Sequence, residues 1–262
     1  MRIFISFFFL LIATSSFATT FEGKFIQGSF ILGKTEAGSE VFIDKKKVKV
    51  TPDGYFAFGL SRDRKNDVVI TIDKKKIVKK IFKRKYNIQR IDGLEEKKVT
   101  PPEEVYERIK RENKWIGEAR AIESNLTFFT KKFIIPVENA IISGVYGSQR
   151  ILNGKPKWPH YGLDFAADEG TKIKAMLDGT VTLAEPDLFY TGGTLIFDHG
   201  HGISTLYMHM EKILVKKGQK VKQGDIIGTV GSTGRATGAH LDVRLNWFQT
   251  RLDPATVLDI NN

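Results

Sequence analysis

The side chains of this chain that could bind a metal or move protons are concentrated in its second half. The 262-residue sequence has no cysteine and five histidines, and every histidine lies after residue 159. The lack of cysteine excludes a disulfide framework, a cysteine-bearing zinc finger, an iron–sulfur cluster and a thiol nucleophile. Histidines with scattered structural roles would be spread along the whole chain, so their grouping suggests a shared site. The five are His160, His199, His201, His209 and His240.

His160 and Asp164 form the first candidate pair, with three residues between them. Pro159 and Gly162 favour a turn or the entry to a strand over a helix at this position. An imidazole nitrogen and a carboxylate oxygen are both ligands of Zn2+ in proteins. Taken alone, a pair of this kind is more often a structural coincidence than a metal site.

His240 and Asp242 form the second candidate pair, and their spacing is more informative. On a strand, residues i and i+2 point to the same face, so both side chains would face one site while Leu241 faces the core. The loop over residues 231–238 contains three glycines and could bring backbone close to a ligand.

The other three histidines are less distinctive. His209 ends a predicted strand over 202–208, with Tyr207 two positions earlier on the same face. The alternative for His209 is a hydrogen-bonded surface histidine. His199 and His201 flank Gly200 in a predicted turn, and we expect both to be structural.

The elements expected to position these residues are mostly strands, so the predicted fold class is mainly β. Residues 19–100 alternate short apolar runs with turn signals, which predicts a small basic β domain with an accessory role. Residues 133–258 predict a second, all-β domain, because glycines separate their short apolar strands. The strands expected include 40–43, 48–50, 55–58, 68–72, 76–78, 179–184, 193–197, 203–208 and 225–230.

Residues 101–125 predict a helix that connects the two β domains. Thr100 and Glu103 have the spacing of a capping box, and Pro101 is tolerated in a first helical turn. Apolar residues fall near one face over 103–123, so we expect the helix to pack one face on a neighbouring domain.

The N-terminus has the pattern of a secretory signal peptide over residues 1–18. Arg2 precedes an apolar run over 3–13, which is too short to span a bilayer, and Ser16 and Ala18 supply the small residues that signal peptidase reads. We expect cleavage before Thr19 and export of the chain, which argues against nucleic acid as a partner. An uncleaved anchor is the alternative.

The basic charge of the chain belongs to one region. The formal net charge is +11, and residues 19–100 contain 20 Lys and Arg against 11 Asp and Glu. Residues 101–262 are nearly balanced, with 20 against 19. A basic surface of this kind favours an anionic polymer or membrane as partner, so we expect the N-terminal β domain to contact anionic cell wall or, peripherally, the membrane. A general preference for exposed lysine is the alternative.

The order of the histidine motifs resembles that of the lysostaphin/LytM-type zinc metallopeptidases. The resemblance covers roughly residues 136–254 and starts from the His160–Asp164 pair, Leu206-Tyr207-Met208-His209 and the Gly231–Asp242 segment. Family members are peptidoglycan hydrolases with a duplicated-hybrid-motif β fold, so the resemblance implies that fold for 133–258. Further matches are Tyr146–Arg150, Gly179–Val181, Asp198–Gly200 and Lys217–Asp225.

The resemblance also implies roles for individual residues. In the family, zinc is held by the His and Asp of the first motif and by the second His of a His-x-His motif, which correspond to His160, Asp164 and Asp242. This chain therefore departs from the family at Asp242, which makes the ligand charge −2 rather than −1 and should weaken the polarising effect of Zn2+. His209 and His240 correspond to the catalytic histidines that orient or deprotonate water and stabilise the oxyanion. Arg150 is a candidate for binding a substrate carboxylate, with a structural ion pair as its alternative.

These correspondences imply an exported, periplasmic zinc endopeptidase that hydrolyses the peptide cross-links of peptidoglycan. The alternative motivated by Asp242 is a catalytically weak or inactive regulator of cell-wall amidases, with an amidase or a divisome protein as its partner. A third reading is a wall-binding β module without a metal. Retention of His160, Asp164, His209 and His240 together argues against that third reading.

Overall fold

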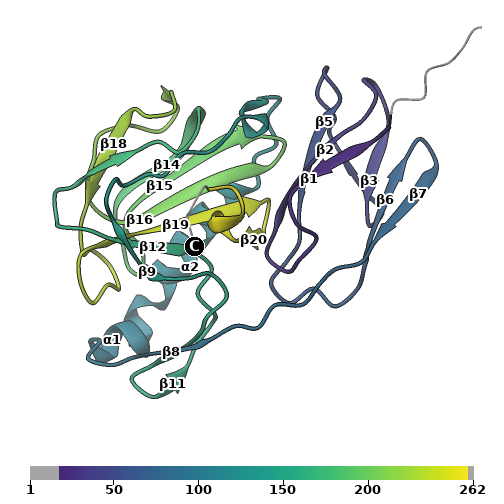
Figure 1. The fold of residues 1–262 in the computed structure, drawn as a ribbon. Coiled ribbons are helices and arrows are strands. Elements are labelled where there is room, and N and C mark those ends of the chain that lie inside the picture. Colours follow the sequence, from purple (N-terminus) through teal and green to yellow (C-terminus); the bar gives the residue numbers. More distant parts are fainter. Residues whose placement is uncertain (1–17, 259–262) are drawn as a thin grey trace, which may run out of the picture.

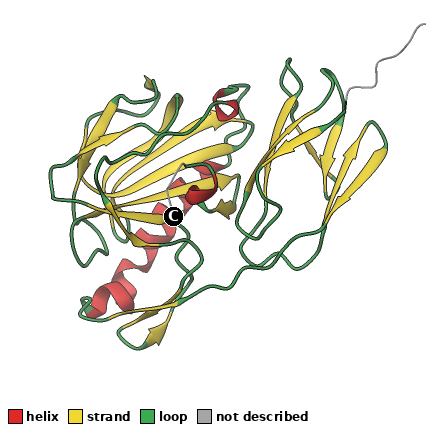
Figure 2. Cartoon of the chain, in the orientation of Figure 1, coloured by secondary structure: helices red, strands yellow, loops and turns green. Residues whose placement is uncertain are grey.

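The computed structural model describes residues 18–258, and strands account for most of its regular structure (Figure 1). The described residues form four β-sheets, with two α-helices and three short 3-10 turns, so the predicted mainly β class is confirmed (Figure 2). The predicted signal peptide at 1–18 lies outside the described residues, apart from Ala18. No helix in the described part of the chain is long and apolar enough to span a membrane.

The N-terminal region consists of two small sheets whose apolar faces share one core. Two hairpins in this region follow the prediction closely, and each turns on an Asp-Lys pair with positive φ, at Asp44–Lys45 and at Asp73–Lys74. Because the turns need only two residues, the strands after them begin earlier than expected. One sheet has the order β1 (Thr20–Glu22), β2 (Phe30–Lys34), β5 (Tyr55–Gly59), and the other has the order β4 (Lys46–Val48), β3 (Val41–Ile43), β6 (Val68–Ile72), β7 (Lys75–Lys79).

The segment between the two β regions contains a strand and two helices. They are β8 (Ile88–Ile91), α1 (Glu96–Val99), the 3-10 turn η1 (Glu103–Val105) and α2 (Tyr106–Arg120). The predicted capping box is wrong, because Thr100 ends α1 and no side chain caps α2. The two prolines at 101 and 102 explain the difference, since a residue before proline is driven to extended backbone and Pro102 itself is extended.

Helix α2 packs on one face of the large C-terminal sheet, as the amphipathic pattern predicted (Figure 2). Ile116 and Ala119 of α2 contact Leu206 and Met208 in a small apolar cluster. The buried Glu112 fixes the helix further, because its Oε2 accepts a hydrogen bond of 2.8 Å from the backbone N of Phe189. The helix is therefore a wall on that face of the sheet rather than a free linker.

The C-terminal region is built around a ten-stranded sheet. Its main path has the order β17-β14-β15-β16-β19-β12-β9, and β13, β18 and β20 pair at its sides. The bounds are β9 (Ile141–Gly144), β12 (Leu163–Ala166), β13 (Lys172–Lys174), β14 (Gly179–Leu188), β15 (Gly192–Gly200), β16 (Ile203–Ile213), β17 (Lys220–Val221), β18 (Ile226–Val230), β19 (His240–Trp247) and β20 (Thr250–Leu252), with the 3-10 turns η2 (Phe128–Thr130) and η3 (Pro254–Thr256).

Along strand β19, apolar side chains point into the core and polar side chains point to the opposite face of the sheet. Its odd-numbered residues Leu241, Val243 and Leu245 are fully buried in the main core. Its even-numbered residues, which a strand turns to the opposite face, are His240, Asp242, Arg244 and Asn246. The polar face of β19 is on the side of the sheet where α2 packs, and Asp242, Arg244 and Asn246 line a cavity together with α2 residues.

The N-terminal and C-terminal regions are joined by extensive contacts. One continuous apolar core includes residues from both regions, and Arg84 forms an ion pair of 2.6 Å with the buried Asp253. Strand β8 pairs in parallel with β10 (Gln149–Leu152), which also pairs with β11 (Lys155–Pro156). The division at 19–100, 101–125 and 133–258 stays a prediction, but a strand from the first of these units borders the site region of the last.

His199 gives a testable consequence of the packed core. It is fully buried, its Nδ1 donates to the carbonyl of Asp178 at 2.7 Å, and its Nε2 accepts from Thr205 Oγ1 at 2.8 Å. Burial lowers its pKa to about 4. The unfolded chain, with an ordinary histidine pKa near 6.5, therefore binds more protons between pH 6.5 and 4, and stability should be lost as the pH falls through this window.

We expect His199→Gln to be less stable than the wild type at pH 7 but to lose less stability on acidification. The difference between the two pH dependences should be about 3 kcal/mol, measured by urea denaturation at pH 7 and pH 4. The other histidines titrate in both proteins and cancel. Parallel pH profiles for the two proteins would show that His199 is not buried in its neutral form.

Candidate metal centre

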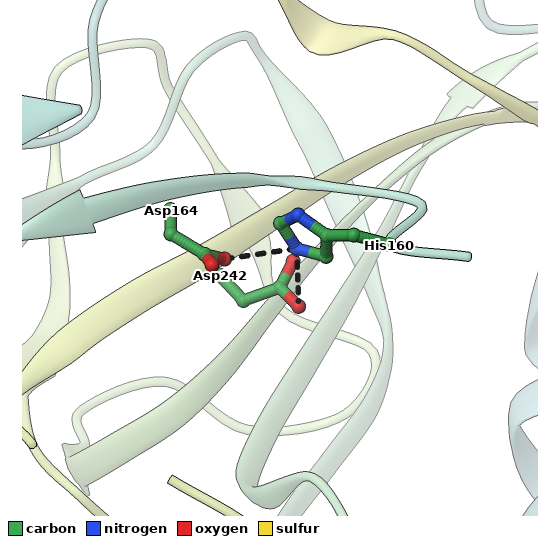
Figure 3. A group of neighbouring side chains, drawn as sticks. All are labelled: His160, Asp164 and Asp242. Carbon is green, nitrogen blue, oxygen red and sulfur yellow. Dashed lines mark hydrogen bonds and ion pairs between the residues drawn. The ribbon is translucent and has the colours of Figure 1, made fainter. Parts of the chain in front are cut away.

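Three side chains from separate parts of the C-terminal region converge on one buried point. His160 lies in the turn before β12, Asp164 lies on β12, and Asp242 lies on β19 (Figure 3). Asp164 and Asp242 are directly opposite each other in the antiparallel β12–β19 pair. One ligand atom from each of the three lies within 4.8 Å of the others. The structure thus brings together all three residues predicted as metal ligands.

His160 is oriented by backbone hydrogen bonds. Its Nδ1 donates to the carbonyl of Val145 at 3.2 Å, and its backbone N donates to the carbonyl of Ser148 at 2.8 Å. With Nδ1 carrying the proton, Nε2 presents a lone pair to the site. This nitrogen lies 3.0 Å from Asp164 Oδ1 and 3.3 Å from Asp242 Oδ2. His160 thus lies at the entry to β12, one of the two arrangements expected, and the ring faces both carboxylates.

An arginine holds each carboxylate from outside the centre. Arg150 Nη2 donates to Asp164 Oδ2 at 3.2 Å. Arg244 donates to both oxygens of Asp242, from Nη2 to Oδ2 at 3.0 Å and from Nε to Oδ1 at 3.3 Å. Burial opposes the charged form of Asp242, yet Arg244 and His160 hold the pKa of this carboxylate well below its ordinary value. Of the two alternatives for Arg150, an ion pair with Asp164 is present.

The centre has the donor set and the unmet bonding that fit a divalent cation. Asp164 Oδ1 is buried and has no hydrogen bond of normal geometry, although His160 Nε2 is close to it. Burial lowers the pKa of His160, but the carboxylates of Asp242 and Asp164 prevail and raise it. One nitrogen and two carboxylate oxygens around a common point, each with an outer partner, are a donor set that Zn2+ accepts. His160, Asp164 and Asp242 are the residues that would hold it.

A β-bulge directs His209 toward this centre. On β15, Thr194 alone lies opposite Met208 and His209, and His209 has φ of 63°. Tyr207 points into the main core, where its hydroxyl accepts a hydrogen bond from the backbone N of Met176. The expectation that Tyr207 and His209 share a face is therefore wrong, because the extra residue of the bulge turns His209 to the other side.

His209 and His240 form a pair beside the three candidate ligands. Their rings are 4.8 Å apart between centroids, and each Nδ1 donates to a backbone carbonyl at 2.8 Å, of Thr233 and of Gly238 respectively. Both Nε2 atoms are thus left as acceptors. Burial and the neighbouring His240 lower the pKa of His209 to about 4, so its ring is neutral at neutral pH. A cavity of about 300 Å³ is lined by both rings together with Asp164 and Arg150.

The two remaining histidines are buried, and the structural role expected of both stays a prediction; His199 lies on β15 rather than in the expected turn. His199 lies in the main core, and His201 is buried with φ of 51° and its ring 4.8 Å from that of Phe129. Neither belongs to the group of possible metal ligands.

Three residues that shape the centre were missed by the sequence analysis. Arg244 follows Asp242 by two residues, so the same strand spacing that linked His240 to Asp242 could have revealed it. Gly144 and Gly162 give space to the carboxylates, because a Cβ at Gly144 would collide with Asp164 Oδ2 and one at Gly162 with Asp242 Oδ1. Gly162 was noted only as a turn or strand-entry signal and Gly144 not at all, since the close approach to the carboxylates arises from strand pairing.

We expect Gly162→Ala to destabilise the protein by about 1–3 kcal/mol, because the added methyl would overlap Asp242 Oδ1 and the carbonyl of Val243. Gly117→Ala on α2 is the matched control, since its Cβ would meet open space and alanine favours a helix by about 1 kcal/mol. Urea denaturation measures both. Equal stability of Gly162→Ala and the wild type would show that Asp242 is not held against Gly162.

Comparison with known proteins gives the relationship of this region. Residues 158–254 match the model of peptidase family M23. Peptidoglycan DD-endopeptidase ShyA of Vibrio cholerae is 46% identical over 87 residues, which are 33% of this chain and 20% of that protein. DD-carboxypeptidase/endopeptidase Mpg of Neisseria meningitidis is 40% identical over 89 residues, which are 33% of this chain and 20% of that protein. The matched segment therefore spans about a fifth of the length of these curated relatives.

A solved structure is similar over nearly the whole chain. It is the crystal structure of a Pseudomonas aeruginosa protein assigned to peptidase M23, with 28% sequence identity and a TM-score of 0.64, and the match covers 89% of this chain and 95% of that one. The likeness extends to the N-terminal strands as well as the site. The segment that carries the buried His–Asp–Asp centre is thus a domain of peptidase family M23.

Proposed function

We propose that this protein is a zinc-dependent endopeptidase that hydrolyses the peptide cross-links of peptidoglycan. The observation that carries the proposal is the centre itself, where His160 Nε2, Asp164 Oδ1 and Asp242 Oδ2 face one buried point and Asp164 Oδ1 has no other partner. The relatives named as peptidoglycan DD-endopeptidase and DD-carboxypeptidase/endopeptidase suggest the substrate class.

Zinc would supply a Lewis acid for the scissile carbonyl and lower the pKa of water at the site. The arginines beside the two aspartates would offset the negative charge of the ligands around the zinc. Asp242 adds a negative charge where related enzymes have histidine, and the bond from Arg244 to both of its oxygens offsets that charge. Arg150 does the same for Asp164. The loss of polarising power expected from two carboxylates is therefore partly recovered.

His209 and His240 are the groups that we assign to proton transfer. The Nδ1 of each is occupied by a backbone carbonyl, so only Nε2 can accept a proton from water. A neutral ring at His209 suits a base, and the adjacent His240 ring lies where a proton could be shared between the two. After protonation, the same rings could donate to the oxyanion or to the leaving amine.

The location we propose is the periplasm, where peptidoglycan lies in Gram-negative bacteria. The excess of Lys and Arg over residues 19–100 would hold the protein to anionic wall or membrane surface.

The second candidate function is a catalytically weak or inactive regulator that binds a cell-wall amidase or a divisome protein. Arg244 favours this candidate, because its guanidinium is bonded to Asp242 Oδ2, the atom that would coordinate the metal. A cation this close would weaken zinc binding by charge repulsion.

Exchange of Asp242 for alanine should lower zinc affinity by more than about 100-fold, since even the loss of a partner that only orients a ligand costs about 10–100-fold. Conversion of a soluble cross-linked muropeptide to its uncross-linked products should fall to background in parallel. Metal content is measured by mass spectrometry on the purified mature chain. Asp187→Ala, at a carboxylate whose side chain is 80% exposed, is the control and should change neither quantity.

The wild-type protein separates the two candidates. Bound zinc together with cleavage of the cross-linked muropeptide supports the endopeptidase. Bound zinc without cleavage favours the regulator. A wild-type protein that takes up no zinc would refute the endopeptidase.

A further inference from the structure

A cavity of about 730 Å³ lies between helix α2 and the polar face of the large sheet, next to the candidate metal centre. Its sheet side is formed by Leu206 and Met208 of β16 and by Asp242, Arg244 and Asn246 of β19. It reaches the centre at Asp242 and His209, and it shares Arg150 and Arg235 with the smaller cavity around His240. The two cavities therefore adjoin at the proposed site of reaction.

The walls of this cavity carry a large excess of positive charge. Five arginines and Lys157 line it, and Asp242 is the only acid among the described residues that do so. Arg150 and Arg244 are paired with the two carboxylates of the centre. The other three form no ion pair with a carboxylate in the part of the chain that the structure describes. These three are Arg120, Arg235 and Arg251.

Arg120 is the least satisfied of these groups. It is 6% exposed and its Nη2 donates to the carbonyl of Gln249 at 2.9 Å, while its Nε has no hydrogen-bond partner among residues 18–258. Burial, with Arg251 and Arg244 nearby, lowers its pKa to about 9. A guanidinium held out of water without a counter-charge is costly to keep, so its presence calls for an anion that is absent from the folded chain alone.

Arg235 and Arg251 are oriented without being neutralised. The guanidinium of Arg235 lies 4.6 Å from the ring centre of Tyr190, and that of Arg251 lies 4.8 Å from the ring centre of Tyr161. Stacking on an aromatic face fixes the plane of a guanidinium and leaves its edge N–H groups for hydrogen bonds. Arg235 Nη1 donates to the carbonyl of Lys98 at 3.3 Å, a neutral group that does not balance the charge. Planar guanidinium groups of this kind bind carboxylates through paired hydrogen bonds.

We propose that the arginine-lined cavity binds free carboxylate groups of the peptide whose bond is cleaved at the adjoining metal centre. That this peptide comes from peptidoglycan rests on the proposed function. A volume of about 730 Å³ is in the range of sites that enclose a ligand of several residues. Helix α2 supplies Arg120 and one wall, so the segment before the M23 domain would take part in substrate selection.

The test is the binding of a soluble cross-linked muropeptide to the metal-stripped full chain, measured by isothermal titration calorimetry. Arg120→Gln and Arg251→Gln should each weaken binding about 10- to 100-fold, because each removes a charged hydrogen-bond donor. Arg111→Gln is the matched control, since Arg111 lies on the exposed side of the same helix and does not line the cavity. It should leave the affinity unchanged.

Two further measurements distinguish lost binding from lost folding, and binding of carboxylates from binding of other parts of the muropeptide. Removal of an unpaired buried charge should leave Arg120→Gln as stable as the wild type or more so, in urea denaturation, while it binds more weakly. A muropeptide with amidated carboxyl groups should lose affinity to the same degree as the variants, and inorganic phosphate should compete with the unmodified muropeptide.

Equal binding of the amidated and free muropeptides, or unchanged affinity in both cavity variants, would overturn the proposal. So would phosphate that binds without displacing the muropeptide. Because zinc and turnover are not needed, a chain that binds the muropeptide through these arginines but never cleaves it would uphold the cavity and refute the peptidase.

Discussion

Two carboxylates lie directly opposite each other on adjacent strands, at Asp164 and Asp242, and like charges in that arrangement repel. Neighbouring cationic and hydrogen-bonding side chains offset this repulsion. Arg150 donates to Asp164 Oδ2, and Arg244 donates to both oxygens of Asp242. His160 Nε2 faces Asp164 Oδ1 and Asp242 Oδ2. Among the described residues, Asp164 Oδ1 is the oxygen of this pair left without a hydrogen bond, and this unmet bonding fits the cation that we propose for the centre.

The sheet makes this arrangement possible by sorting residues onto two faces. Along β19 the core receives the aliphatic side chains, and the α2 side receives the histidine, aspartate, arginine and asparagine. The bulge in β16 is the one break in this alternation that the site requires, because a regular strand would have placed His209 in the core with Tyr207. Helix α2 then closes the polar face and keeps its arginines away from bulk water.

The sequence was sufficient to predict the features that depend on local spacing. The mainly β class, the hairpins over 41–48 and 68–79 and the two pairs His160–Asp164 and His240–Asp242 follow from residue type, period and turn signals. The choice of His160, Asp164 and Asp242 as one ligand set came from the family resemblance. The bulge at His209, the space at Gly144 and the cavity could not be predicted, because each depends on which strands become neighbours. The start of α2 was wrong because proline geometry outweighed a capping pattern.

The parallel pairing of β8 with β10 bears on how this protein can be divided. A fragment that begins at residue 133 would retain every candidate ligand, yet it would expose the edge of β10 where β8 had bonded and would lose Arg120 with the rest of α2. In our proposal, the unit that recognises the substrate is therefore larger than residues 158–254, which match the M23 family model. If relatives exchanged the segment that begins at residue 133, the candidate metal centre would be transferred without Arg120 and the rest of α2, which we propose select the substrate.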